Sequence, residues 1–312
     1  MDITLLRTFL AVSATGSFAD ASQRLFVTQS AVSLRIQKLE LDLGHALFTR
    51  SKAGAAQTPQ GREFEHYALS IVRIWEEARQ QIAIPEGFDQ SLSIGAQYSL
   101  WQRLGFRLLD RVRIKAPTIS LRAEVGMPER LTRFLTEGVV QAALLFTPTL
   151  RPGLSVRKLI DDDLVLAASW PNATMDDIRG HYVFVDWGPE FVQAHAMSLP
   201  DLTNPGLTLA IGALSADFIS RRHYAAYLPA RTLTRYLEAG TLHLVAGAPS
   251  FPYPTWLVWR NDNNPEVIAL IDACIDEVMT GIDAETDEVF DQLKLLNDGD
   301  FPEILGDTET HN

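Results

Sequence analysis

The chain has 312 residues, of which 46% are hydrophobic and 21% are charged. It is too long for one typical hydrophobic core and too apolar to be disordered, so these values predict a soluble protein with two unequal domains. Its formal net charge of −12 argues against a protein that coats nucleic acid indiscriminately.

The N-terminus and the cysteine content predict a cytoplasmic protein with no membrane partner. Asp2 stands where a secretory signal needs lysine or arginine, and no apolar run approaches the roughly 18 residues of a membrane span. The single cysteine, Cys274, has no partner for a disulfide within the chain and is expected to be a small buried side chain.

Positive charge is concentrated near the N-terminus. Residues 1–62 carry a net charge of +3, from seven Lys and Arg against four Asp and Glu, which leaves −15 for the remainder. A basic segment on an acidic body favours docking at specific DNA over wrapping, because only that segment attracts phosphate. A chance distribution over solvated surfaces is the alternative.

Two helices are predicted first, with a short break between them. The first carries apolar residues at helical spacing and stops at Gly16. The second begins after Ser17 as N-cap and runs to Leu25 through small residues that allow close packing. The apolar face of the first helix contains Leu6, Phe9, Leu10 and Val12.

A third helix follows a three-residue turn at residues 26–28. It is expected from Gln29 to Leu43, with Thr28 as N-cap and Gly44 at its end. Its apolar stripe contains Val32, Ile36, Leu39 and Leu43. Two helices joined by such a turn, with one apolar stripe on the second, are the arrangement that sets a recognition helix into the major groove of DNA.

The polar side of this third helix supplies candidate DNA contacts. Successive residues are about 100° apart, so side chains away from the stripe face outward. The candidates are Thr28, Gln29, Ser30, Ser33, Leu34, Gln37 and Lys38. Gln29 can pair with an adenine edge, and the serines can bond a base or a phosphate. Leu34 either touches a thymine methyl group or is an ordinary exposed leucine.

An ordered series of motifs in residues 18–61 resembles the signature of the LysR-type transcriptional regulators. The matching positions are Phe18-Ala19-Asp20-Ala21-Ser22, Leu25, Val27-Thr28-Gln29-Ser30-Ala31-Val32-Ser33, Ile36, Leu39-Glu40, Leu43-Gly44, Leu47-Phe48-Thr49-Arg50, Thr58-Pro59 and Gly61. The resemblance implies that Gln29, Ser33 and Arg50 contact DNA and that residues 51–57 form a wing. Family wings usually carry Arg or Lys near the end of this segment, whereas here only Lys52 remains to reach DNA, so weaker affinity from the wing is expected.

We expect residues 1–58 to form this winged helix-turn-helix domain and residues 59–90 to form a linker helix and hinge. The helix begins after Thr58 and ends before Pro85. Apolar residues recur along it at alternating spacings of four and three, which predicts a seam between two helices. The seam contains Phe64, Ala68, Ile71, Trp75, Ala78 and Ile82. Packing on its own domain is the alternative; a dimer would present two recognition helices to one two-fold DNA site.

From residue 91 strand-like runs alternate with helices, which predicts an α/β domain. A first parallel unit is expected from strands at 91–97, 119–125, 141–146 and 163–168 and helices at 101–112 and 128–137. A second unit is expected from strands at 182–186, 207–211, 224–228 and 242–245 and helices near 188–197, 215–222 and 230–239. Residues 255–260 and a helix from Pro265 are expected to return to the first lobe.

The resemblance implies that this region is a two-lobed fold similar to periplasmic solute-binding proteins, with a small-molecule effector between the lobes. We place the effector-binding domain at 91–300, with lobe I at about 91–162 and 262–300 and lobe II at about 163–261. An acidic tail is expected at 301–312. Among relatives, a dimer of dimers is usual, so we expect a homodimer or a homotetramer.

Candidate effector contacts lie after the predicted strands, because ligands of open parallel sheets bind beyond the carboxyl ends of the strands. They are Ser99, Leu100, Trp101, Met127, Thr147, Trp187 and Ser215. The two serines would bond a ligand and the two tryptophans would cover its apolar part; capping and packing are the alternative reading. Adjacent Arg221 and Arg222 either attract an anionic effector or form a solvated helix face.

Segments 99–101 and 187–189 look like a branch of the family that includes a flagellar-operon repressor. No catalytic or cofactor motif is recognised: the seven histidines lack metal-ligand spacing, and there is no Gly-x-Ser-x-Gly elbow, P-loop or Gly-x-Gly-x-x-Gly. Asp161–Asp163 is interpreted as a turn before a strand. A transport-type solute receptor is the alternative for the second half, but the N-terminal segment disfavours it. The sequence therefore predicts a nucleoid-associated regulator that binds double-stranded promoter DNA and needs no metal or cofactor.

Overall fold

The computed structural model describes residues 2–51, 54–149, 151–203, 205–280 and 295. They form two compact units. Among the described residues, the first unit contains those up to Ser93 with Thr118–Ser120 and Arg133–Gln141, and the second contains Ile94–Pro117, Leu121–Thr132 and those from Ala142 onward. Among the described helices, none is long and apolar enough to cross a membrane. The predicted acidic tail at 301–312 lies outside the described residues.

The three predicted N-terminal helices are confirmed, together with their capping residues. They are α1 (Ile3–Thr15), α2 (Phe18–Leu25) and α3 (Gln29–Leu43). The hydroxyls of Ser17 and Thr28 each accept a hydrogen bond from the backbone N–H three residues further on. Gly16 and Gly44 end α1 and α3 in the left-handed conformation, which a residue without Cβ adopts at little cost. Local capping therefore sets the turn between α2 and α3.

A two-stranded hairpin and a long helix complete this part of the chain. They are β1 (Phe48–Ser51), β2 (Gly54–Gln57) and α4 (Pro59–Ile82). We call α1 to α3 and the β1–β2 hairpin the recognition head. Its core also includes residues from α4 and contains Leu6, Phe9, Val12, Val32, Ile36, Leu39, Leu47, Phe48, Ala68 and Val72. A Cβ added to Gly61 would lie 2.2 Å from the carbonyl oxygen of Leu47, so glycine allows α4 to approach the strand.

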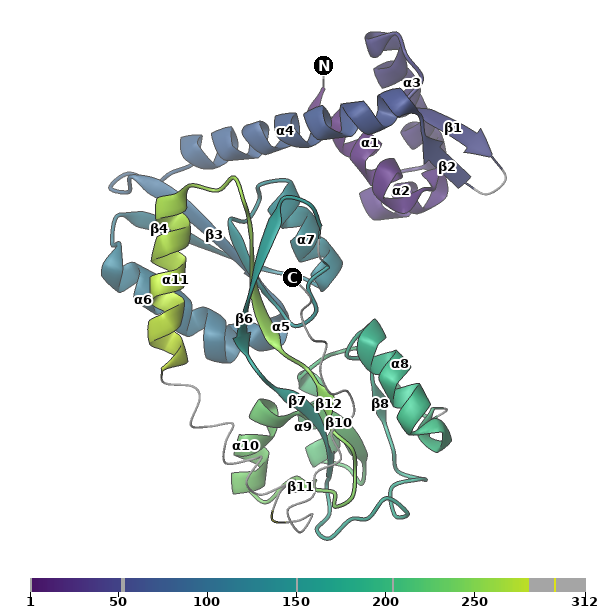
Figure 1. Cartoon of the computed structure of the whole chain (residues 1–312), viewed down its shortest axis with the longest axis vertical. Coiled ribbons are helices and arrows are strands. Elements are labelled where there is room, and N and C mark those ends of the chain that lie inside the picture. The colour runs from purple at the N-terminus through teal and green to yellow at the C-terminus, as the bar shows by residue number, and fades with distance from the viewer. Residues whose placement is uncertain (1, 52–53, 150, 204, 281–294, 296–312) are drawn as a thin grey trace, which may run out of the picture. The chain divides into compact units, whose positions relative to one another are not determined.

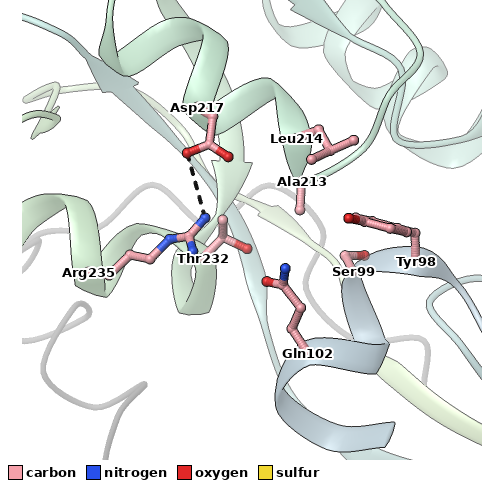
Figure 2. A pocket seen from close by; sticks show the side chains of 8 residues that line it. All are labelled: Tyr98, Ser99, Gln102, Ala213, Leu214, Asp217, Thr232 and Arg235. Atoms are coloured by element: carbon pink, nitrogen blue, oxygen red, sulfur yellow. Dashed lines mark ion pairs between the residues drawn. The ribbon is translucent and has the colours of Figure 1, made fainter. Parts of the chain in front are cut away.

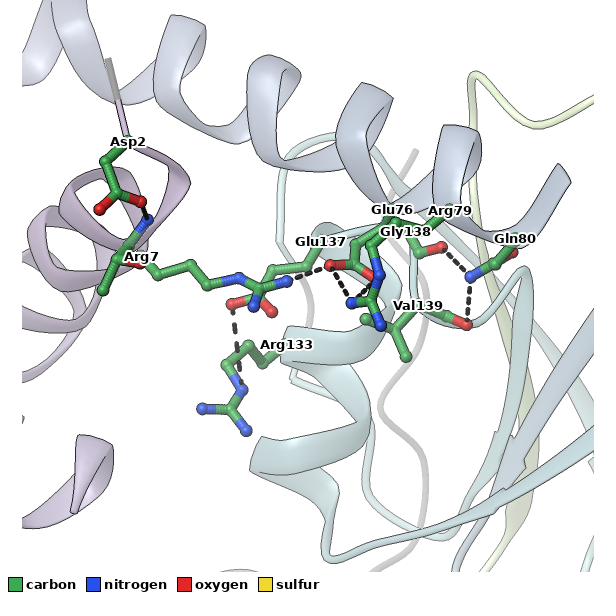
Figure 3. A network of polar contacts seen from close by, with 10 residues as sticks. Asp2, Arg7, Glu76, Arg79, Gln80, Arg133, Glu137, Gly138 and Val139 are labelled. Carbon is green, nitrogen blue, oxygen red and sulfur yellow. Dashed lines mark hydrogen bonds and ion pairs between the residues drawn. The ribbon is translucent and has the colours of Figure 1, made fainter. Parts of the chain in front are cut away.

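Polar contacts also tie α4 to its surroundings within the first unit (Figure 3). The buried carboxylate of Glu76 forms ion pairs with Arg7 of α1 and with Arg79. One turn later, the amide of Gln80 donates hydrogen bonds of 3.1 Å to both carbonyl oxygens of Gly138–Val139. Because a buried carboxylate needs such partners, Glu76 helps to fix α4 against α1.

The larger sheet has the strand order β4-β3-β5-β13-β6. Its strands are β3 (Gln90–Ala96), β4 (Ile119–Val125), β5 (Ala142–Leu145), β6 (Leu154–Ile160) and β13 (Thr255–Arg260). The helices of this lobe are α5 (Tyr98–Leu100), α6 (Phe106–Lys115), α7 (Pro128–Thr136) and α11 (Pro265–Met279). A π-helical segment, Trp101–Gly105, joins α5 to α6. Strand β3 is parallel to β5, whereas β13 is antiparallel to β5 and β6.

The second sheet has the order β10-β7-β11, and β12 also pairs with β7. Its strands are β7 (Asp163–Ala168), β10 (Ala225–Pro229), β11 (His243–Leu244) and β12 (Phe251–Pro252). A separate parallel pair contains β8 (Phe184–Val185) and β9 (Thr208–Leu209). The helices are α8 (Pro189–Ser198), α9 (Leu214–Ser220) and α10 (Ala230–Glu238), with a short 3₁₀ turn at Pro200–Leu202.

The strand pairing corrects one expectation and confirms another. Residues 163–168 do not belong to a first parallel unit, because β7 pairs antiparallel with β10, β11 and β12 in the second sheet. Residues 255–260 form a strand of the larger sheet, as expected for a segment that returns to the first lobe, so lobe II ends before the expected bound of about 261. Apolar runs show that a strand is buried, but they do not show its direction or its neighbours.

The chain passes twice between the two sheets, at residues 161–162 and 253–254 (Figure 1). The two crossings lie side by side, because the backbone N–H of Tyr253 donates a 2.6 Å hydrogen bond to the carbonyl oxygen of Asp162. We call the two sheets and their helices the effector-binding domain, after the role that the resemblance implies. Its two lobes are therefore joined by a pair of hydrogen-bonded segments.

Candidate functional site: a recognition helix and an interlobe pocket

Helix α3 presents a polar face opposite its buried stripe. Val32, Ile36 and Leu39 have no exposed surface, so they fix which side of the helix faces outward. The exposed candidates are Thr28, Gln29, Ser30, Leu34, Gln37 and Lys38, and Ser33 is half-buried. Leu34 is 65% exposed, which leaves its methyl groups free to contact another surface. The structure thus brings the helix candidates together on one face.

The start of α3 is organised by Thr28. Its hydroxyl accepts the N–H of Ala31 and lies 3.0 Å from the hydroxyl of Ser30. Gln29 remains exposed at this first turn, where the helix also has free backbone N–H groups. These N–H groups and the positive end of the helix dipole favour a phosphate group nearby.

The hairpin after α3 is the expected wing. Strands β1 and β2 are antiparallel, with Arg50 opposite Ala55 in the register. Glu40 of α3 holds this hairpin, because its carboxylate accepts the backbone N–H groups of Leu47 and Phe48 at 2.7 and 3.2 Å. Lys52 lies outside the described residues. Hydrogen bonds from backbone N–H groups to the Glu40 side chain therefore place the hairpin beside α3, and the predicted roles of Arg50 and Lys52 stay predictions.

The surface of α4 differs from the predicted seam. Ala68 is fully buried in the core of its own chain, so the expectation that it faces a partner helix is wrong. Phe64 and Ile71 also pack against that core. The physical reason is that α4 completes the hydrophobic core of the recognition head. The exposed apolar residues of α4 are Tyr67, Ile74, Trp75, Ala78 and Ile82, which share one face of the helix.

A pocket lies between the two lobes of the effector-binding domain (Figure 2). It encloses about 470 Å³, part of which is open to solvent. Its lining consists of Tyr98, Ser99, Gln102, Ala213, Leu214, Asp217, Thr232 and Arg235. The first three come from α5 and the π-helical segment, and the other five come from α9, the residue before it and α10. The part of this space that the centres of water-sized molecules can occupy is about 60 Å³.

One acidic and one basic residue of the pocket form an ion pair. The guanidinium of Arg235 lies 3.9 Å from a carboxylate oxygen of Asp217. The hydroxyl of Tyr236 donates a 2.6 Å hydrogen bond to Asp217 and accepts one of 2.7 Å from Arg235. Burial, followed by the hydrogen bond to Asp217, raises the pKa of Tyr236. This hydroxyl therefore stays protonated at neutral pH and can hold both charged groups.

Only Ser99 among the predicted effector contacts lines this pocket. The two tryptophans are buried packing residues: Trp101 donates to the carbonyl of Glu124, and Trp187 donates to the carbonyl of Tyr227. The expectation that either ring covers a ligand in this pocket is therefore wrong.

The other four predicted contacts also lie outside the pocket lining. Leu100 is buried and Thr147 is half-buried, whereas Met127 is 65% exposed. Ser215 is fully buried, and its hydroxyl has no hydrogen-bond partner among the described residues. A position after a strand or at a helix start thus did not decide which side chains face the pocket.

Sequence reasoning missed the acidic and basic side chains of the pocket. Asp217 and Arg235 lie inside helices α9 and α10, away from the strand ends where ligand contacts are expected. A signal was present in the strong amphipathic pattern of α10, in which Leu233 is buried while Thr232 and Arg235 are less so. The predicted arginine pair is elsewhere: Arg222 lies over the ring of Phe218, 4.1 Å from its centre.

The acidic triplet at the first crossing has a structural role in the described chain. Asp162 is buried, and its carboxylate lies 3.9 Å from the guanidinium of Arg231. Burial raises the pKa of Asp162 to about 7, although Arg231 favours its ionised form. Asp161 pairs with Lys158, and Asp163 accepts a hydrogen bond from Ser250. Among the described residues, no group of three or more potential metal ligands gathers.

Comparison with known proteins assigns both parts of the chain. Residues 3–62 match the bacterial regulatory helix-turn-helix protein, lysR family, and residues 85–279 match the LysR substrate binding domain. The HTH-type transcriptional regulator HdfR of Salmonella newport is 30% identical over 284 residues, which cover 90% of this chain and 100% of that protein. The HdfR protein of Salmonella schwarzengrund is 30% identical over 267 residues, covering 85% of this chain and 94% of that protein.

Two solved structures share the fold. ArgP from Mycobacterium tuberculosis has a TM-score of 0.54 at 20% identity, covering 90% of this chain and 98% of its own. Full-length LysG from Corynebacterium glutamicum with bound effector Arg has a TM-score of 0.53 at 20% identity, covering 90% of this chain and 99% of its own. The resemblance in residues 18–61 is confirmed, and the chain belongs to the LysR family of transcriptional regulators, with an N-terminal helix-turn-helix domain and a C-terminal effector-binding domain.

Proposed function

We propose that this regulator reads promoter DNA with the exposed face of α3 and that a small molecule in the interlobe pocket controls it. The observation that carries the proposal is the division of α3 into a fully buried stripe and a polar, exposed face. In a helix-turn-helix domain, that face is the one that enters the major groove. Gln29 would read a base edge, and Lys38 would contact phosphate.

The effector acts through its different affinities for two arrangements of the lobes. The pocket takes residues from both lobes, so a ligand that contacts both would favour the arrangement that closes on it. Bound effector Arg in the solved structure of LysG supports a small-molecule effector in this fold.

Genome-wide footprinting followed by gel shifts tests DNA recognition. On a bound fragment, Gln29→Ala should relax the preference for one base at one position. The difference in binding free energy between the preferred base and the others should fall by about 1–3 kcal/mol. Lys38→Ala should weaken binding to all sequences alike and lower the salt dependence. Equal, sequence-independent losses from both substitutions would contradict the assignment, as would binding with no preference over random duplex.

We propose that the exposed face of α4 pairs two copies of the chain. Trp75 is 48% exposed and Ile82 is 87% exposed, although both are large apolar side chains. A partner helix would remove this apolar surface from water. Burial of apolar surface is the dominant favourable contribution to the free energy of association. The resulting two-fold dimer would carry two recognition helices, and the family resemblance implies that two such dimers assemble further.

Light scattering on the full chain tests the pairing. The double variant Trp75→Glu, Ile82→Lys should be a monomer that loses binding to the full site, because one head makes only half of the contacts. The control is Glu77→Lys, an exposed change of charge on α4 outside the apolar face, which should stay oligomeric. A double variant that remains a dimer would show that α4 is not the pairing helix.

A further inference from the structure

The interlobe pocket has an unusual charge pattern for a site that takes one small molecule. Arg235 and Asp217 line the same pocket, and the side chain of each is 51% exposed (Figure 2). Both charges are therefore accessible to a ligand and remain solvated without one. The gap of 3.9 Å between their nearest atoms is wider than a strong charge-assisted hydrogen bond.

The two charges are held in place before any ligand binds. Tyr236 bridges them through its hydroxyl, and the guanidinium of Arg235 also lies over the ring of Tyr236, 4.6 Å from its centre. A long arginine side chain loses conformational entropy when it is fixed by a ligand. Because Tyr236 already restrains Arg235, less of that entropy has to be lost on binding.

The rest of the pocket lining is uncharged, so the formal charge of the lining is zero. Ser99, Gln102 and Thr232 supply hydrogen-bonding groups on the two sides of the pocket, and Tyr98 and Leu214 supply half-exposed apolar surface. An anion drawn to Arg235 would be repelled by Asp217, and a cation drawn to Asp217 would be repelled by Arg235. A molecule that carries both charges would be attracted at both ends.

We propose that the effector is a small zwitterion, an α-amino acid with an uncharged side chain. Its carboxylate pairs with Arg235, its ammonium group pairs with Asp217, and its side chain lies against Tyr98 and Leu214. The inference rests on the proposed function, since it names the chemical class of ligand for the same pocket. It also explains why the pocket needs residues from both lobes: the charged pair comes from one lobe, and Tyr98 and Gln102 come from the other.

Isothermal titration calorimetry with the full chain tests the class of ligand. The probes are the uncharged-side-chain α-amino acids, followed for each binder by its N-acetyl derivative and its methyl ester, which lack the ammonium and the carboxylate charge respectively. At least one amino acid should bind, and both derivatives should bind at least tenfold more weakly. The proposal is overturned if no amino acid binds at 10 mM, or if either derivative binds as tightly as its parent.

Variants then assign the two charges. Arg235→Gln and Asp217→Asn should each weaken amino-acid binding at least tenfold, and Tyr236→Phe should weaken it less because both charges remain. Arg221→Gln removes an exposed arginine outside the pocket lining and should bind like the parent chain. Unchanged affinity in the folded Arg235→Gln and Asp217→Asn proteins, checked by circular dichroism, would overturn the assignment.

The same proteins separate this inference from the proposed function. If the footprint on promoter DNA responds to an anionic or neutral metabolite but to no amino acid, the zwitterion assignment fails while effector control stands. If DNA binding lacks any sequence preference, the proposed function fails whatever the pocket binds.

Discussion

The recognition head and the effector-binding domain build their candidate sites in different ways. In the head, most of the candidate DNA contacts lie on one helix whose opposite side is the hydrophobic core. In the effector-binding domain, the pocket is assembled from segments near residues 98–102, 213–217 and 232–235, which are far apart in the sequence. A site on one helix follows from helical periodicity, whereas a site between lobes depends on tertiary packing.

The two regions also differ in what surrounds the functional residues. In the head, Glu40 holds the backbone at the start of the hairpin and Gly61 allows α4 to approach Leu47, and neither is one of the candidate DNA contacts. In the effector-binding domain, Trp101 packs directly beside Gln102, so a core residue and a pocket residue are neighbours in the chain. In the head, we therefore expect most substitutions to change either stability or DNA binding, but not both. In the effector-binding domain, two adjacent residues can differ in whether their substitution changes stability or ligand binding.

The largest expected effect comes from Trp101→Ala. The indole is 6% exposed and lies so close to Gly105 that an added Cβ there would be 2.4 Å from the ring. Its removal should cost about 4 kcal/mol of unfolding free energy, measured by urea denaturation. Gln102→Ala is the control: it should change stability by less than about 0.5 kcal/mol and weaken ligand binding. Equal stability of the two variants would contradict the packing role of Trp101.

A smaller effect, confined to the head, is expected from Gly61→Ala. The added Cβ would meet the Leu47 carbonyl oxygen at 2.2 Å, so α4 or the strand must shift. We expect a loss of about 3 kcal/mol and loss of DNA binding, with ligand binding by the effector-binding domain retained. Gly44→Ala is the comparison, because a Cβ there meets nothing within 4 Å; its left-handed backbone alone should cost about 1 kcal/mol. Similar losses in both variants would argue against the contact.

The smallest effect is a pH dependence in lobe II. His195 is 1% exposed and its Nε2 lies 2.8 Å from the Tyr182 hydroxyl, and burial lowers the pKa of His195 to about 4. The unfolded chain binds the proton at the ordinary pKa near 6.5, so acidification favours unfolding. The contribution of neutral His195 to the free energy of unfolding is fully present above pH 6.5. It is lost as the pH falls toward 4, and the loss is about 2 kcal/mol at pH 5.

His195→Gln isolates this effect, because glutamine does not titrate. The variant loses native packing, which lowers its free energy of unfolding at every pH. The comparison is therefore made between the slopes of this free energy against pH and not between its absolute values. Urea denaturation at pH 7.5, 6 and 5 should give a flatter pH dependence for the variant than for the parent chain. Parallel slopes would show that His195 does not control the acid response.

Several features of the head could be predicted from the sequence because they depend on local interactions. Ser17 and Thr28 cap the helices that their positions indicated, and the stripe of Val32, Ile36 and Leu39 is buried. The heptad pattern on α4 was only half informative. It identified Trp75 and Ile82 on an exposed face, but Ala68 belongs to the core of its own chain.

The effector-binding domain was predictable as α/β from alternating strands and helices, but strand direction and pocket residues were not. The apolar run of β7 has the composition expected of a buried strand in either orientation. Trp187 and Ser215 follow strand ends or begin a helix as predicted, yet both side chains are buried in lobe II. Local position indicates where a chain turns, but packing decides which side chain remains exposed.

The sequence by itself determined the family, the three N-terminal helices with their caps, and the polar face of α3. These depend on residue spacing within one helix. Each residue is rotated by about 100° from the one before, so its position in the sequence sets the side of the helix on which its side chain lies. Only the tertiary structure decided that β7 pairs antiparallel in the second sheet, that α4 completes the core of the head, and that Asp217 and Arg235 share a pocket. These arrangements depend on contacts between segments distant in sequence, which periodicity within a segment does not specify.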